Sequence, residues 1–123
     1  MREHFVVAPE DAFDARYGLE YVSPTQARAT LACAPTAGVY AAIAESLASA
    51  ATAIEVLDAG FFPSGLSNAT YVVGEAGPGV IVASARCRAR GELEWLWDVE
   101  IGPPDGAPTA LATVVIAVRP VSR

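Results

Sequence analysis

The chain has 123 residues and a mass of 12.7 kDa, which leaves room for one domain with one hydrophobic core. Hydrophobic residues make up 53% of it and charged residues only 18%, which excludes a disordered chain and predicts an apolar face that is buried in an oligomer. The net charge of −6 argues against nucleic acid or an anionic membrane as a partner. Every basic residue is an arginine, so lysine chemistry such as Schiff-base formation is excluded.

Composition also bears on metal binding and on location. Cys33 and Cys87 lack the spacing of a metal site, and the one histidine cannot complete a zinc set with them, so we expect no metal. The first five residues carry mixed charge and begin no secretory signal, which predicts a cytoplasmic location. The apolar residues 37–54 are interrupted by Glu45, which favours a helix packed inside protein over a membrane span.

The first half of the chain predicts a short helix, a strand and a long helix. Residues 9–18 open with proline and acidic residues, as the first turn of a short helix does. Residues 19–33 predict a bent or two-part strand around a central proline. Apolar residues then recur at steps of three and four over 39–54, which predicts a long helix. Thr36 is its expected N-cap and Gly60 its expected end.

The second half has the alternation and the turn residues of β-strands. The predicted strands are residues 67–73, 80–90, 92–101 and 109–118. Short turns rich in glycine and proline separate them, so strands adjacent in sequence are expected to pair antiparallel. Arg86, Arg88 and Arg90 alternate with small residues, which predicts three guanidinium groups on one face. The order of elements predicts an α+β fold over residues 1–123, a single domain whose antiparallel sheet wraps around one long central helix.

Glu45 is the residue of this helix that most invites a chemical interpretation. It lies among residues that are otherwise apolar or small. A carboxylate in such a helix either reaches solvent as an ordinary surface group or is held where its surroundings tune its reactivity. The residues alone leave both alternatives open.

The start of the long helix resembles a known motif. Residues 36–46 are similar to the central-helix motif of hotdog-fold acyl-CoA thioesterases of the 4-hydroxybenzoyl-CoA and phenylacetate-pathway type. Those enzymes open the helix with His-Gly-Gly and carry Asp or Glu nine residues after the histidine. Thr36 stands at the histidine position, Ala37 and Gly38 at the two glycines, and Glu45 at the acidic position. The resemblance extends, more weakly, to residues 13–20, Asn68, Tyr71 and Arg90-Gly91.

This resemblance implies a hotdog fold and a thioesterase activity. The backbone amides of Ala37 and Gly38 would polarise the thioester carbonyl. Glu45 would act as a nucleophile or as a general base on water, and both roles stay open. Ser49, one turn later, would orient the carboxylate or the water, although a small helix-packing residue is an equally valid interpretation of it.

Candidate substrate-binding residues can also be named. They are Thr36, Tyr40, Asn68, Arg88 and Arg90. Tyr40 would line the acyl pocket, although an ordinary place in the core is an equally valid interpretation of it. Arg88 and Arg90, together with Arg86, would bind the phosphates of coenzyme A, since guanidinium groups suit phosphate oxygens. The alternative for them is a solvated strand face that pairs with neighbouring glutamates.

The expected substrate is an acyl-CoA or acyl-carrier thioester, with no cofactor beyond the coenzyme A of the substrate itself. Family members place their sites at a dimer interface, so a homodimer is expected, and two dimers can pair into a homotetramer. The alternative is a non-catalytic hotdog protein that binds an acyl or aromatic ligand or serves as a structural partner. Thr36-Ala37 in place of His-Gly favours that alternative. A hotdog dehydratase is less well supported, because those enzymes use a catalytic histidine and this chain has only His4.

Overall fold

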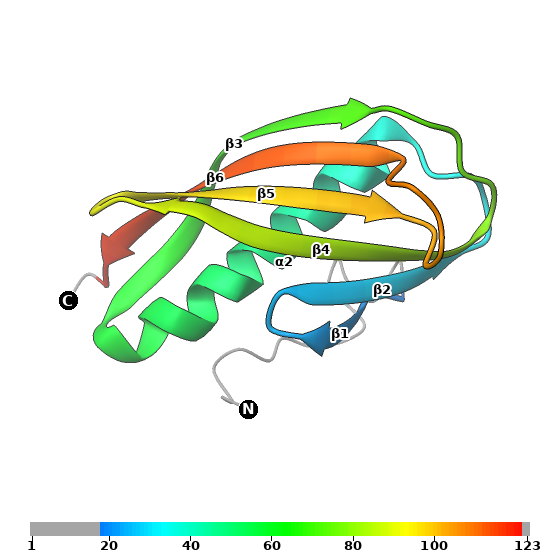
Figure 1. The fold of residues 1–123 in the computed structure, drawn as a ribbon. Helices are drawn as coiled ribbons and strands as arrows, with labels where there is room; N and C mark the ends of the chain where they lie inside the picture. Colours follow the sequence, from blue (N-terminus) through cyan, green and yellow to red (C-terminus); the bar gives the residue numbers. More distant parts are fainter. Residues whose placement is uncertain (1–17, 122–123) are drawn as a thin grey trace.

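The structure is a computed structural model that describes residues 18–121, and its elements follow the order strand, helix, strand (Figure 1). They are β1 (Glu20–Ser23), β2 (Gln26–Leu31), α2 (Ala37–Val56), the 3-10 turn η2 (Leu57–Ala59), β3 (Phe61–Val72), β4 (Gly79–Arg90), β5 (Glu94–Gly102) and β6 (Ala110–Pro120). The short helix predicted at residues 9–18 and His4 lie outside the described residues.

The strands form one six-stranded sheet in the order β1-β2-β4-β5-β6-β3, with every pair antiparallel. The sheet curls along α2, which crosses behind it as one long helix (Figure 1). The predicted α+β class, an antiparallel sheet around one central helix, is confirmed. Strands β1 and β3 are the two edges of this sheet, and among the described strands β3 has β6 as its one neighbour.

Helix α2 begins and ends where the sequence predicts. The Thr36 hydroxyl accepts a hydrogen bond from the Val39 amide at 3.2 Å, which caps the first turn. The helix passes into η2 and stops at Gly60, whose φ of 88° lies in the left-handed region that glycine tolerates. By length and composition alone the helix would pass for a membrane span, but a face of it is buried in the core of the fold.

The core lies between this helix and the inner face of the sheet. Its largest side chain is Trp97, whose indole donates to the Thr52 hydroxyl at 2.9 Å, and that hydroxyl donates to the Ala48 carbonyl at 2.8 Å. Among the described residues, every buried side-chain polar atom has a hydrogen-bond partner. This satisfied core fixes the depth and rotation of the helix against the sheet.

Strand β3 is longer than predicted. It begins at Phe61 instead of residue 67, and Pro63 lies within it opposite Val118. The prediction was wrong because proline usually interrupts strands, whereas an edge strand has one side that needs no amide donor. A β-bulge follows, because Gly65 faces Ile116 and Ser67 faces Val115, which leaves Leu66 as an extra residue.

A second bulge lies in β4. Cys87 faces Trp97 and Ala89 faces Leu96, so Arg88 is the extra residue. The bulge turns Arg90 toward the helix, where its guanidinium meets Glu55. The prediction that Arg86, Arg88 and Arg90 share one face is therefore wrong, since strict alternation ends at Arg88.

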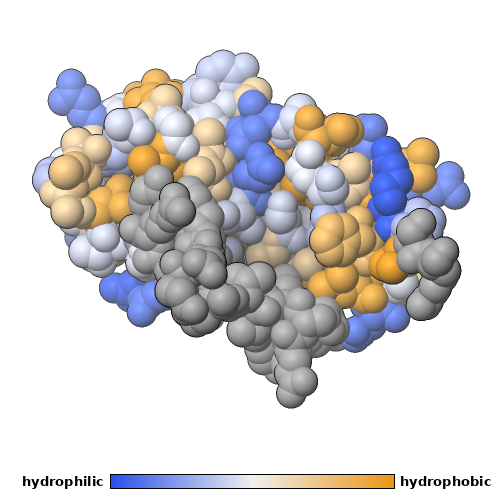
Figure 2. Space-filling view, turned by 180° about the vertical axis from the view of Figure 1, so that it is seen from behind, coloured by the Kyte–Doolittle hydropathy of each residue, from blue (hydrophilic) through white to orange (hydrophobic). Residues whose placement is uncertain are grey.

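Large hydrophobic side chains remain exposed outside the core. Seen from behind the view of Figure 1, hydrophobic residues gather in several patches between hydrophilic ones (Figure 2). Four of these exposed side chains belong to β3, namely Phe62, Leu66, Tyr71 and Val72. Part of the exposed apolar surface thus lies on an edge strand.

Candidate active site

One side of α2 opens to solvent at Glu45. Ala42 and Ser46 are four residues apart, as are Glu45 and Ser49, so the four side chains lie on one face of the helix. They line an open pocket of about 410 Å³. Ser49 lies one turn after Glu45 and lines the same pocket, and its role in orienting the carboxylate or the water stays a prediction. The pocket thus offers an acid and two hydroxyl groups within a short distance of one another.

Within residues 18–121 the carboxylate of Glu45 has no ion-pair partner. No described residue forms a hydrogen bond or an ion pair with it, and the side chain is exposed. It lies directly against β3 at Gly65, where a Cβ atom would stand 2.8 Å from Cδ of Glu45 and closer still to Oε2. Glu45 is therefore an available acid or base whose nearest strand neighbour is bare backbone.

Gly65 was not among the residues that the sequence singled out. A glycine inside a strand is a known sign of a bulge or of close approach by another group, and both occur here. The signal was missed because the predicted strand began only at residue 67, after this glycine.

The start of α2 presents two amides that no residue in the described part of the chain pairs with. Ala37 and Gly38 carry the first helical N–H groups, which have no carbonyl one turn earlier, while Thr36 already serves the amides of Val39 and Tyr40. Both residues are exposed, and the positive end of the helix dipole lies there. An anion or a polarised carbonyl oxygen would be stabilised at this point.

Two predicted binding residues have well-defined packing roles. Tyr40 is 1% exposed, and its hydroxyl is hydrogen-bonded to that of Thr109 at 2.6 Å. Asn68, half-buried in β3, donates from its side-chain amide to the Ala41 carbonyl of α2 at 2.8 Å. The structure places both residues at the contact between helix and sheet, and contact with substrate stays a prediction for them and for Thr36.

Arg88 and Arg90 both face acidic residues. Nε of Arg88 lies 3.1 Å from Oδ2 of Asp98. Arg90 forms a two-pronged ion pair with Glu55, with one N–O distance of 2.9 Å, and its guanidinium lies 4.7 Å from the ring centre of Trp95. The hydrogen bond with Glu55 raises the pKa of Arg90 above its ordinary value. Binding of coenzyme A phosphates by these arginines stays a prediction.

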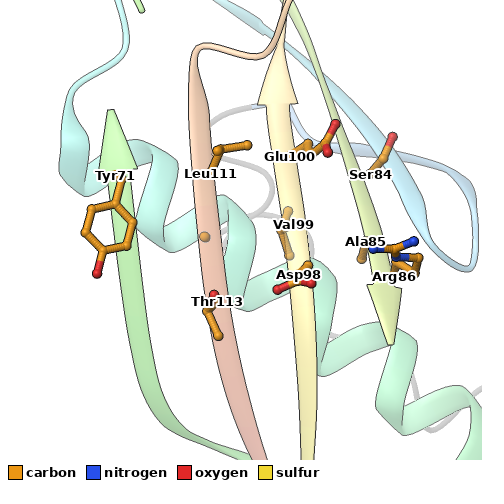
Figure 3. Close-up of a pocket in the computed structure, with 10 residues that line it drawn as sticks. Tyr71, Ser84, Ala85, Arg86, Asp98, Val99, Glu100, Leu111 and Thr113 are labelled. Atoms are coloured by element: carbon orange, nitrogen blue, oxygen red, sulfur yellow. The ribbon is translucent and has the colours of Figure 1, made fainter. Parts of the chain in front are cut away.

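A larger pocket, of about 600 Å³, lies away from Glu45. Figure 3 shows Tyr71, Thr113, Asp98 and Arg86 around it, carried by β3, β6, β5 and β4 with the helix behind the sheet. Neither Glu45 nor the start of α2 lines it. We therefore place the candidate site at Glu45 in spite of the smaller volume there. Among residues 18–121, no group of three His, Cys, Asp or Glu residues is placed to hold a metal ion.

The same fold occurs in solved structures of thioesterases. A mutant of thioesterase PA1618 from Pseudomonas aeruginosa matches with a TM-score of 0.84 and 22% identity, over 97% of this chain and 94% of its own. Thioesterase HI1161 from Haemophilus influenzae matches with a TM-score of 0.81 and 15% identity, over 96% and 94%. The chain has the hotdog fold.

The hotdog fold expected from the helix motif is thus confirmed. Protein BH2602 from Bacillus halodurans, solved with CoA, shares it with a TM-score of 0.77 and 12% identity, over 85% of this chain and 74% of its own. No family model matches the sequence.

Proposed function

We propose that this hotdog protein is a thioesterase that hydrolyses an acyl-CoA or acyl-carrier thioester. The observation that carries the proposal is the Glu45 carboxylate in an open pocket of a helix with free amides at its start, where neither group has a hydrogen-bond partner among the described residues. The thioesterases PA1618 and HI1161, which have the same fold, support this reaction. The presence of CoA in the structure of BH2602 supports a CoA thioester as the substrate.

The spacing along α2 favours a site shared by two copies of the chain. Ala37 and Glu45 are eight residues apart, so their backbones are separated by about 12 Å along the helix axis. A single thioester carbonyl cannot contact the amide at the helix start and the carboxylate of the same helix. We therefore assign the amides of Ala37 and Gly38 to one copy and Glu45 to the other.

Strand β3 is the surface through which the two copies would meet. It is a long edge strand with an unpaired row of backbone groups, and Leu66 is 53% and Tyr71 63% exposed on it. Such an edge favours pairing with another strand. Gly65 and Glu45 lie beside this edge, so pairing there would bring a second copy to the pocket. A homodimer is proposed on this ground, with further pairing of dimers into a tetramer as its extension.

The chemistry follows from these groups. The helix-start amides bind the carbonyl oxygen and stabilise the negative charge that develops on it. As a general base, Glu45 takes a proton from water, the resulting oxygen nucleophile attacks the carbonyl carbon, and the tetrahedral intermediate expels the thiolate. As a nucleophile, Glu45 attacks the same carbon, the thiolate leaves, and water hydrolyses the anhydride. Both routes release one acid and one thiol, and neither needs a metal or a cofactor outside the substrate.

Thiol release from a panel of aryl, short-chain and medium-chain acyl-CoAs tests the proposal. We expect turnover by the wild type on at least one substrate and none above background by Glu45→Ala at the same concentration of folded protein. Glu55→Ala is the matched control, because it removes the same side chain from the same helix outside the pocket.

Equal turnover by wild type and Glu45→Ala would refute Glu45 as the catalytic carboxylate. No turnover by a folded dimer on any thioester would refute the enzyme and favour the non-catalytic binding role. Ala37 stands where the motif has its first glycine, and its Cβ would crowd the acyl group. Ala37→Gly would then be the first substitution to make.

A further inference from the structure

Strand β3 approaches the turn of α2 that carries Glu45 at two points. One contact involves a residue without any assigned role, and the other involves Asn68, for which only a contact with substrate is predicted. The first is Gly65. The three nearest heavy atoms that a Cβ atom there would meet all belong to the Glu45 carboxyl group. The φ angle of Gly65 is not in the left-handed region, so its backbone does not require glycine. What this position requires is space.

The second contact is Asn68. Its side-chain amide donates to the Ala41 carbonyl at 2.8 Å, and the Thr70 hydroxyl donates to its Oδ1 at 2.6 Å, which fixes the orientation of the amide. In an α-helix the carbonyl of residue 41 also accepts the backbone N–H of residue 45. Asn68 therefore holds the strand to the same turn from which the Glu45 side chain extends.

The bulge at Leu66 makes both contacts possible. Gly65 and Asn68 are three residues apart, so in a regular strand they would point to opposite faces. The extra residue changes this, because Gly65 is paired with Ile116 and Asn68 with Val114, and both partners belong to the core that faces the helix.

We propose that Gly65 and Asn68, aligned by the bulge at Leu66, are positioning residues that hold the Glu45 carboxylate in its reactive place. Gly65 leaves the space that the carboxylate occupies, and Asn68 fixes the distance between strand and helix. This inference rests on the proposed thioesterase function. A side chain without a charged partner depends on such packing for its orientation, and a displacement of about 1 Å lowers a catalytic rate about a hundredfold.

Gly65→Ala is the principal test. The three atoms nearest to the added methyl group all belong to the end of a flexible side chain, so we expect the variant to fold with an unchanged midpoint of thermal unfolding and to carry a displaced carboxylate. The expected result is a kcat lowered about a hundredfold with KM changed less than about twofold, since only the position of the reacting group is altered. Gly77→Ala is the matched control, because nothing lies within 4 Å of a Cβ atom there.

A set of variants at the second contact separates positioning from stability. Asn68→Asp replaces the donor by an acceptor that repels the Ala41 carbonyl, whereas Thr70→Val removes only the hydroxyl that orients Asn68. We expect kcat to fall more in Asn68→Asp than in Thr70→Val, with KM retained in both. Lower thermal stability together with an unchanged kcat would show a merely structural role and would overturn the proposal for Asn68.

A crystal structure of Gly65→Ala decides the inference independently of activity. A carboxylate moved away from β3 supports positioning by Gly65, even where the wild type hydrolyses no thioester and the proposed function has failed. A carboxylate in its original place, or an unchanged kcat in an active enzyme, would overturn the inference while leaving the thioesterase proposal intact.

Discussion

Two glutamates of α2, ten residues apart, meet opposite surroundings. Glu55, near the C-terminal end of the helix, is paired with Arg90, which also lies over Trp95. Glu45, in the first half, has no ion pair with any described residue and lies against the bare backbone of Gly65. A negative charge near a helix C-terminus is unfavourable, so the arginine offsets it. A carboxylate left without such a partner is free to act on a substrate.

Both surroundings depend on a β-bulge. The bulge at Arg88 brings Arg90 to the helix side of β4, where it neutralises Glu55. The bulge at Leu66 brings Asn68 to the helix side of β3, where it contacts backbone and leaves the Glu45 charge alone. A β-bulge thus contributes to stability near the C-terminal end of the helix. In our proposal, another β-bulge positions the catalytic carboxylate in the first half of the helix.

The largest effect is expected from replacing the unpaired glutamate. Glu45→Gln removes the base or nucleophile while keeping the size of the side chain, so thiol release should fall about 10²- to 10⁴-fold with the fold retained. The same change at Glu55 should leave kcat within about twofold. Comparable losses in the two variants would break the contrast between the glutamates.

Disrupting the edge of β3 is expected to abolish activity by another route. Leu66→Arg places a charge on the proposed contact between copies, so sedimentation should show monomers, and activity should be lost although Glu45 is intact. Leu93→Arg is the matched control, because Leu93 is 55% exposed in the turn before β5. A Leu66→Arg variant that remained a fully active dimer would contradict the use of this edge.

A moderate loss of stability is expected from removing the N-cap of α2. Thr36→Ala removes the hydroxyl that accepts the Val39 amide and should lower the free energy of unfolding by about 1 kcal/mol, measured by urea denaturation. Thr36→Ser keeps the hydroxyl and should retain most of that stability. If both variants were equally stable, the cap would contribute nothing.

The smallest change in stability is expected from replacing Glu55, the glutamate that is paired with Arg90. Glu55→Gln breaks a half-exposed ion pair, so the free energy of unfolding should fall by about 0.2–1 kcal/mol, and by less at high salt. A loss well above this range, unaffected by salt, would show that Glu55 does more than pair with Arg90.

Local patterns in the sequence predicted much of the fold. Apolar periodicity, the cap at Thr36 and the glycine at Gly60 placed the helix, since these depend on neighbours along the chain. The turns placed β4 and β6 within about two residues. The spacing from Thr36 to Glu45 predicted the hotdog fold through its resemblance to a known motif.

The register of the strands and the contacts across the sheet could be determined only from the folded chain. Each bulge adds one residue to a strand and reverses which face later side chains occupy, and no local pattern marked Leu66 or Arg88 as the extra residue. Pro63 is compatible with a strand only because β3 became an edge, which depends on the order of all six strands. Residue type and spacing identified Glu45 as a candidate, but its closeness to Gly65 and the pairing of Glu55 with Arg90 join segments distant in sequence, and only packing brings such segments together.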